Sequence, residues 1–438
     1  MHRILVFLLL LAPAAFAEAI DRPAPVTDDA YSPVRLEEAE LGQFLFYDPI
    51  LSGNREVACA TCHHPDLGTS DGLSLGIGDG GRGLGPDRTF DPENLPEERI
   101  PRNATALFNL GATEFTVLFH DGRIEADPTR ETGLRTPMGP DMEAGFASVL
   151  SAQTMFPVLS ADEMAGHYSE NEVAQATRQG FITGPGGAWD LLSRRIAAIP
   201  DYASRFERVY GLAPDEIHFT DISNAIAAFV AFEWRSDQAP FDAWLRDEAD
   251  LPAEALQGAA LFYGDAGCGG CHTGPFLTDH DFHAMGEMQI GPGKKARFES
   301  HFRDVGRMGV TGAAADAYAF RTPSLRNVAT TGPYGHAGAY RDLAAYIRHH
   351  ANPVAAIATY DRTQARLVEP GEEDWHILQD EAELAAIADA VGVAPVTLSD
   401  ADVAALVAFL DTLTDPTMAD GRLGVPDSVP SGLAVPTP

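Results

Sequence analysis

Cys59-Ala-Thr-Cys62-His63 and Cys268-Gly-Gly-Cys271-His272 are the stretches that decide the fold of this 438-residue chain, and they contain all four of its cysteines. A Cys-x-x-Cys pair followed directly by histidine is typical of covalent haem attachment, with the thiols on the vinyl groups and the histidine on the iron. The alternatives are a zinc knuckle, which needs four ligands, and a thioredoxin-like redox pair. Neither explains a histidine at the same offset twice. The sequence therefore predicts two c-type haems, with proximal ligands His63 and His272.

The residues before each motif also repeat. Leu41-Gly-Gln-Phe-Leu45-Phe46-Tyr47 precedes the first motif and Leu256-Gln-Gly-Ala-Ala-Leu261-Phe262-Tyr263 precedes the second. The apolar spacing of each copy predicts a helix that packs behind a haem. Because alternating β-branched residues are scarce, we expect a mainly α fold with two cytochrome-c-like domains, each binding one covalently attached haem. The expected boundaries are 18–240 for the first domain, 241–415 for the second and 416–438 for an extended tail.

The coarse pattern between these points is also helical. Apolar periodicity predicts helices near 36–45, 189–209, 221–234, 340–351, 379–391 and 399–412. Residues 67–101 are crowded with glycine, proline and charge, which predicts a long loop on the haem edge and no strand pair. Residues 286–312 are rich in glycine, and 235–252 is the expected crossing between the domains.

The first residues resemble a secretory signal. A basic start at His2-Arg3 leads into an apolar run over 4–11 and then Ala15-Phe-Ala17, which predicts a signal peptide over 1–17. The run is too short to span a bilayer, and no later segment has the length. We therefore expect an exported protein with no membrane span. Its expected location is the periplasm, where c-type haems are assembled.

The chain is strongly acidic, with 64 acidic residues against 30 basic ones and a formal net charge of -34. Nucleic acid and anionic membranes are therefore poor partners. An acidic surface is most often only a solvated one. It would also steer a basic electron carrier toward the protein.

Four stretches carry a resemblance to the bacterial dihaem cytochrome c peroxidases and their relatives of the MauG type. They are Leu41-Gly-Gln-Phe-Leu-Phe-Tyr-Asp-Pro-Ile-Leu-Ser-Gly-Asn54, Phe119-His-Asp-Gly-Arg123, Phe156-Pro-Val-Leu-Ser-Ala-Asp-Glu-Met164 and Phe320-Arg-Thr-Pro-Ser-Leu-Arg-Asn-Val-Ala-Thr-Thr-Gly-Pro-Tyr-Gly-His336. The resemblance runs from about residue 36 to about 415. It implies that the N-terminal haem reacts with hydrogen peroxide and that the C-terminal haem relays electrons from a donor protein, such as a small cytochrome c or a cupredoxin.

Peroxide chemistry needs a group that takes a proton from one oxygen and returns it to the departing one. The family has a Gln and a Glu ten residues apart for this purpose, and the resemblance assigns these roles to Gln153 and Glu163. Glu163 is the expected general acid/base, and Gln153 is expected to orient peroxide or water. The alternative is that Glu163 only starts a helix after Ser160.

Many relatives rest with a loop histidine blocking the N-terminal iron. Here no histidine lies between Pro65 and Phe119. His64 directly follows the proximal ligand and cannot reach the opposite face of the haem. We therefore expect an N-terminal haem that is five-coordinate or water-bound at rest.

The C-terminal iron needs a sixth ligand for electron transfer. In the peroxidases a Met lies fourteen residues after the histidine of the Pro-Tyr-x-His motif, and here that offset from His336 gives His350. His272 and His350 would form a bis-histidine haem of lowered potential, with His349 as the neighbour that might substitute. Alternatively, both are solvated histidines near a helix C-terminus. Weaker ligand candidates are Tyr340, Met285, Met288 and Met308.

Two further features follow from the resemblance. The family usually has a bridging tryptophan between the haems, and this chain has His120 at that position. His120 either relays electrons by a hydrogen bond to a haem propionate or is only structural. A calcium ion is implied at Asn103 through its side chain and at Thr331 and Pro333 through their carbonyls, because hard cations prefer oxygen ligands. Residues 124–150 contain an insertion that we expect to shape access to the peroxidatic haem.

Three functions fit these residues. The leading one is a periplasmic haem peroxidase that reduces hydrogen peroxide with electrons entering at the second haem. A MauG-like enzyme that oxidises a side chain of a protein substrate is the alternative, favoured by the missing blocking histidine, the non-Met ligand and the altered bridge. A non-catalytic electron-transfer dihaem cytochrome would need two six-coordinate haems and no role for Glu163.

Overall fold

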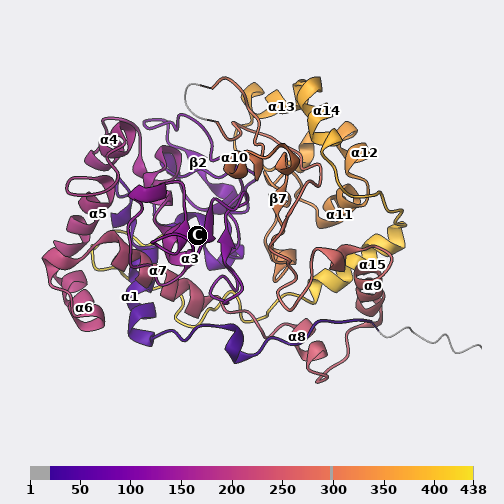
Figure 1. Cartoon of the computed structure of the whole chain (residues 1–438), viewed down its shortest axis with the longest axis horizontal. Helices are drawn as coiled ribbons and strands as arrows, with labels where there is room; N and C mark the ends of the chain where they lie inside the picture. The colour runs from indigo at the N-terminus through magenta and orange to yellow at the C-terminus, as the bar shows by residue number, and fades with distance from the viewer. Residues whose placement is uncertain (1–19, 296–298, 438) are drawn as a thin grey trace, which may run out of the picture.

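The computed structural model describes residues 20–295 and 299–437, so the expected signal peptide lies outside the described residues. The protein is mostly helical, with short strands between the helices. The N-terminal half lies on the left of Figure 1 and the C-terminal half on the right. No helix in the described ranges combines the length and the apolar character needed to cross a membrane.

The same helix crossing occurs in both halves. Helix α1 (Leu36–Tyr47) packs on α7 (Phe219–Glu233), and α9 (Ala253–Tyr263) packs on α15 (Asp400–Asp411). A methyl group on Gly42 of α1 would overlap the carbonyl oxygen of Ala225, and one on Gly258 of α9 would overlap that of Ala405. Equivalent glycines therefore permit equivalent close crossings, and the sequence repeat before the haem motifs is also a repeat of packing.

The other helices of the N-terminal half enclose its core. They are α2 (Cys59–Cys62), α3 (Val149–Thr154), α4 (Glu172–Gln179), α5 (Ala188–Ala197) and α6 (Pro200–Tyr210). The helix expected over 189–209 is in fact two, because Pro200 begins α6 at a position where its missing N–H has no cost. The helices expected near 36–45 and 221–234 are confirmed as α1 and α7.

The C-terminal half has its own core, which begins at Ala239. The expected crossing over 235–252 contains α8 (Pro240–Leu245), where Asp242 forms a fully buried ion pair with Arg326 at 2.8 Å. The helices expected near 340–351, 379–391 and 399–412 are confirmed as α11 (Leu343–Ala351), α14 (Glu381–Asp389) and α15. The sequence pattern missed the short helices α10 (Met308–Thr311), α12 (Pro353–Ala358) and α13 (His376–Gln379).

The loop expected over 67–101 contains one small strand pair, so the prediction of no strands there is wrong in this detail. Strand β1 (Gly81–Arg82) pairs with β2 (Thr89–Phe90) in an antiparallel register. The buried Arg88 guanidinium donates hydrogen bonds of 2.5–2.6 Å to the carbonyls of Ile77, Gly78 and Gly83 and so holds the turn together. These side-chain contacts, which apolar periodicity does not reveal, stabilise the turn that joins the two strands.

Two further small sheets connect distant segments. Strands β3 (Val117–Leu118), β4 (Ile124–Ala126) and β5 (Leu134–Arg135) form one sheet, and β6 (Phe282–His283) pairs with β7 (Phe320–Arg321). The inserted region over 124–150 thus begins as a hairpin on β3. Glu125 of this hairpin pairs with Arg135 and also with Arg307 of the C-terminal half, so the insertion ties the two halves together.

The tail after Asp415 is extended, and it returns to the N-terminal half (Figure 1). The Glu233 carboxylate accepts hydrogen bonds from the backbone N–H groups of Arg422, Leu423 and Gly424 at 2.7–3.0 Å. Val429 is buried in the N-terminal core, and Ser431 donates to the Asp48 carboxylate at 2.6 Å. We call residues 416–437 the C-terminal strap, because they connect the last helix of one half to the core of the other.

Candidate active site

One cavity of about 690 Å³ runs between the two halves, and both Cys-x-x-Cys-His motifs lie on its walls. Cys59, Cys62 and His63 line one part, and Cys268, Cys271 and His272 line the other. The lining is mostly apolar, which suits a porphyrin. All four cysteines are free thiols, as attachment to haem requires.

The two proximal histidines are held in the same way. His63 Nδ1 lies 2.9 Å from the Thr69 carbonyl oxygen, and His272 Nδ1 lies 3.0 Å from the Leu277 carbonyl oxygen. Because a carbonyl only accepts, each Nδ1 carries the proton and donates. Each Nε2 then keeps a free electron pair for iron, which is the tautomer and orientation that a histidine ligand needs. These residues fit the predicted haems.

Cationic side chains on the cavity wall also fit haem. Arg102, Arg321 and Lys294 line the cavity, and within the described ranges none of them forms an ion pair with a carboxylate. Burial lowers the pKa of Arg102 and Arg321 to about 10 in each case, and the Arg102 charge adds to the effect on Arg321. A partly buried cation such as Arg102 or Arg321 is costly without an anion, and the propionates of bound haems would supply that charge.

Glu163 and Gln153 both line the cavity, as does His63. Glu163 lies on the helical turn Ala161–Ala165, where its backbone N–H donates to Ser160 Oγ at 3.3 Å. The Ser160 hydroxyl therefore caps this turn by accepting from the Glu163 backbone N–H, and the Glu163 side chain lines the cavity. Burial raises the pKa of this carboxyl to about 7, although the charges of Lys294 and Arg123 act against the shift. A group of that pKa exchanges protons readily near neutral pH.

The structure separates the candidate ligands of the second iron. His350 lines the cavity and lies near His272, whose pKa falls to about 4 mainly through burial, with a smaller contribution from the His350 charge. His349 is turned away and buried, with Nδ1 3.0 Å from the Tyr340 hydroxyl and Nε2 3.2 Å from the Met285 carbonyl. Of the weaker candidates, only Met285 lines the cavity.

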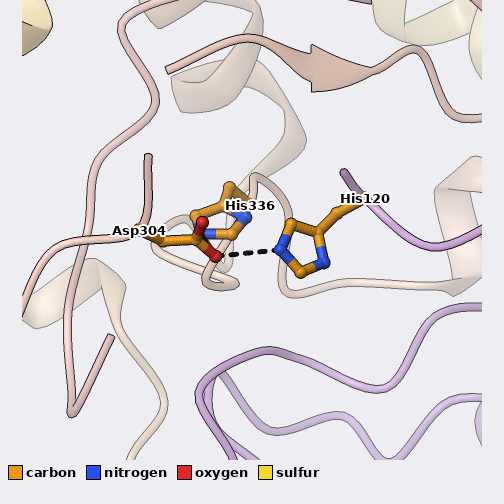
Figure 2. A group of neighbouring side chains, drawn as sticks. All are labelled: His120, Asp304 and His336. Carbon is orange, nitrogen blue, oxygen red and sulfur yellow. Dashed lines mark hydrogen bonds and ion pairs between the residues drawn. The ribbon is translucent and has the colours of Figure 1, made fainter. Parts of the chain in front are cut away.

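His120 lies at the tip of the β3–β4 hairpin and reaches the C-terminal half. Its Nε2 is 2.9 Å from Asp304 Oδ2, and the Nε2 of His336 approaches the same oxygen at 3.3 Å (Figure 2). Two histidines and one carboxylate form a common metal-binding set. Here, however, the Arg102 guanidinium donates to His336 Nδ1 at 2.5 Å, so the neutral ring carries its proton on Nε2. We therefore interpret these three residues as a hydrogen-bonded triad and not as a metal site.

A second group of potential metal ligands, Cys271, Asp279 and His283, lies beside the second motif. The Cys271 sulfur is required for haem attachment, which leaves an Asp279–His283 ion pair of 2.8 Å. Such a pair is too small a set of ligands for a structural metal site.

The residues expected to bind calcium lie together. Asn103 Nδ2 donates to the Pro333 carbonyl oxygen at 3.0 Å, and Thr331 lines the same part of the cavity. As placed, the amide nitrogen of Asn103 faces that carbonyl. A half-turn of the amide group would present oxygen instead, so the set fits a hard cation only after this rotation.

Sequence patterns did not reveal several cavity residues. Arg102 and Lys294 carried no signal because an isolated cation in a loop looks like any surface charge, and Arg321 lay in the Phe320–His336 stretch without a role of its own. Asp304 was hidden in the glycine-rich stretch, and only its partners His120 and His336 lay in motifs. Long-range placement, not local sequence, brings the three cations to the cavity and Asp304 to His120 and His336.

Comparisons with known proteins agree with this geometry. A family model described as di-haem cytochrome c peroxidase matches residues 36–250. The methylamine utilization protein MauG of Methylorubrum extorquens is 31% identical over 77% of this chain and 75% of its own length. A cytochrome c551 peroxidase of Nitrosomonas europaea is 29% identical over 70% of this chain and 71% of its own length. The crystal structure of a MauG-like protein associated with microbial copper homeostasis superposes with a TM-score of 0.57 at 25% identity, covering 93% of this chain and 97% of that one.

Proposed function

Because the chain belongs to the di-haem cytochrome c peroxidase family, we propose that it reduces hydrogen peroxide to water in the periplasm with electrons from a small donor protein. As a member of this family it is an oxidoreductase with two c-type haems. The finer assignment gives one haem to each half, over 18–240 and 241–415. The repeated helix crossings and the matching proximal histidines support that division.

The observation that carries the proposal is the placement of Glu163 on the cavity that His63 also lines. A haem held there by Cys59, Cys62 and His63 would supply the electrons that reduce peroxide. Glu163 then takes a proton from the near oxygen and returns it to the far oxygen, which leaves as water. A pKa of about 7 lets one group perform both transfers.

Gln153 of α3 lines the same cavity as Glu163, and its uncharged amide both donates and accepts hydrogen bonds. We infer that Gln153 orients peroxide or water before the proton moves. No histidine occurs between Pro65 and Phe119 to compete for this space. The proposed resting state therefore keeps the face opposite His63 open to peroxide.

His350 is the proposed sixth ligand of the second haem. Its Nδ1 lies 3.3 Å from the Tyr346 carbonyl, which leaves Nε2 for iron. Two histidine ligands reduce the reorganisation that accompanies electron transfer, and they give a lower potential than Met would. Electrons from a basic donor, a small cytochrome c or cupredoxin, would enter on this side of an acidic protein.

The second candidate function is peroxide-dependent oxidation of a protein side chain, as in MauG-like enzymes. The observation that favours it is the pair of departures at the second haem and the bridge, where His350 replaces Met and the His120 triad replaces tryptophan. The similarity to MauG from Methylorubrum extorquens agrees with this candidate.

One experiment separates the two. We expect the holoenzyme to oxidise a reduced small cytochrome c with multiple turnovers per second when peroxide is added, which is typical of enzymes. Slow turnover, together with a rapid change in the haem spectrum on peroxide addition, would identify the protein-modifying function instead. An unchanged haem spectrum would contradict both.

The calcium assignment at Asn103, Thr331 and Pro333 also remains a proposal. The contact between Asn103 and Pro333 supports it, because it brings two of the oxygen-bearing groups together. Metal analysis should find calcium in the purified wild-type protein. It should find none in Asn103→Ala. Equal calcium content in wild type and variant would contradict the assignment.

A further inference from the structure

Three tyrosine rings form a continuous chain that begins at His350. The Tyr346 ring centroid lies 4.4 Å from that of His350, the Tyr340 centroid lies 5.5 Å from that of Tyr346, and the Tyr360 centroid lies 5.3 Å from that of Tyr340. Tyr340 is buried, whereas Tyr360 is partly exposed. Tyr360 lies just after the end of α12, which lies toward the outer edge of the C-terminal half (Figure 1).

Two of these phenols donate to groups that can receive a proton. The Tyr346 hydroxyl donates to Glu287 Oε1 at 2.7 Å. The Tyr340 hydroxyl lies 3.0 Å from His349 Nδ1, and His349 Nε2 lies 3.2 Å from the Met285 carbonyl oxygen. Since a carbonyl cannot donate, Nε2 carries the histidine proton and Nδ1 accepts from the phenol.

We propose that Tyr346, Tyr340 and Tyr360 form a redox relay that carries oxidising equivalents from the His350 side of the cavity to the protein surface. The relay rests on the proposed function, since peroxide is its oxidant. Reduction of hydrogen peroxide to two waters takes two electrons and two protons. Each tyrosine that is oxidised supplies one electron and loses its hydroxyl proton. The Tyr346 and Tyr340 protons pass along the existing hydrogen bonds to Glu287 and His349. The Tyr360 hydroxyl donates to the Ala339 carbonyl oxygen at 2.6 Å, which cannot take up a proton, so oxidation of Tyr360 releases its proton to water.

The same chemistry explains how the relay is refilled. A radical that reaches Tyr360 returns to tyrosine by taking one electron and one proton from a phenol or indole of a protein bound at that surface. This step oxidises the partner side chain and restores the O–H bond. Tyr360 therefore marks the surface at which an oxidisable protein substrate is expected to dock.

Packing alone is the competing explanation, and the chain offers a matched control for it. Tyr318 belongs to the same buried cluster as Tyr340, and its hydroxyl donates to Glu383 at 2.6 Å. Yet among the ring contacts of the described residues, Tyr318 makes none with the relay. Tyr318→Phe thus removes a buried, carboxylate-bound phenol without interrupting the chain of rings.

The test adds peroxide to the reductant-free holoprotein, freezes it within milliseconds and records both the haem absorption and the electron paramagnetic resonance of a phenoxyl radical. We expect the radical in wild type and in Tyr318→Phe, and its loss in Tyr346→Phe, although the haem absorption still responds to peroxide. Peptide mapping should find oxidation at residue 360 in wild type and a loss of oxidation products there in Tyr346→Phe.

Two results would overturn the relay while leaving the peroxidase assignment in place. One is an undiminished radical in Tyr346→Phe, and the other is a haem that responds to peroxide in a wild-type protein that forms no radical. If the haem absorption does not respond at all, the proposed function fails and the relay fails with it, because its oxidant is missing.

Discussion

Glu163 is the residue on which the proposed peroxide chemistry depends. Replacing it with Gln keeps the shape but removes the group that exchanges protons, so we expect the rate of the peroxide-induced haem change to fall by about 10²–10⁴-fold. Stopped-flow absorbance measures this rate. Asp162→Asn is the matched control, because burial also raises the pKa of that neighbouring carboxyl, to about 6, yet Asp162 does not line the cavity. Equal losses in both variants would contradict the assignment.

The same carboxyl gives a pH dependence with a defined sign. Burial raises the pKa of Glu163 to about 7, and only the ionised form can take a proton from peroxide. The rate of reaction with peroxide should therefore decline as the pH falls below about 7 and reach a plateau above it. In Glu163→Gln this acid limb should disappear; if it persists unchanged in the variant, another group is responsible.

The sixth ligand of the second haem is tested by two adjacent histidines. His350 lines the cavity, whereas His349 is bound to Tyr340 and to the Met285 carbonyl. We expect His350→Ala to convert the low-spin signal of one haem into a high-spin signal in electron paramagnetic resonance. His349→Gln should leave the low-spin signal. The opposite pattern would assign the ligand to His349.

At the level of elements, the two helix crossings depend on single glycines. A methyl group on Gly258 would overlap the Ala405 carbonyl oxygen, so Gly258→Ala should lower the free energy of unfolding by about 1–3 kcal/mol or more. Gly392→Ala is the control, since a methyl group there meets no atom within 4 Å. Urea unfolding of the two holoproteins checks the difference, and equal stabilities would contradict the packing argument.

The C-terminal strap depends on Glu233. Its carboxylate accepts three backbone hydrogen bonds from the strap, and Glu233→Ala would leave those N–H groups without their charged acceptor. We expect a loss of about 1.5–3 kcal/mol of stability and faster proteolysis within 416–437. Glu207→Ala, at an exposed position on α6, serves as the control. Unchanged protease resistance in Glu233→Ala would show that the strap is held by other contacts.

Local patterns predicted the long helices because each needs only its own apolar spacing. The haem motifs were accessible for the same reason, since each is a pattern of five consecutive residues, whereas the roles of Glu163 and Gln153 were only implied by the family resemblance. The β1–β2 pair was not, because it depends on Arg88 reaching three carbonyls. Asp304 likewise became visible only when the fold brought it to His120 and His336.

For the whole molecule, similar halves surround a cavity that is chemically unequal at its two ends. His63 shares it with Glu163 and Gln153, and His272 shares it with His350. The insertion hairpin and the strap connect the halves, so the two sites are held in one frame. The family resemblance predicted from the sequence is confirmed by the comparisons. The central claim is that the first haem reacts with peroxide and the second haem relays electrons.

Electron paramagnetic resonance of the fully oxidised holoenzyme, before any peroxide is added, tests that claim most directly. We predict one high-spin haem, with His63 as its proximal ligand and the opposite face open, and an equal amount of one low-spin haem with His272 and His350 as ligands. Two low-spin haems in the resting protein would contradict the claim, because neither iron would then be free to bind peroxide.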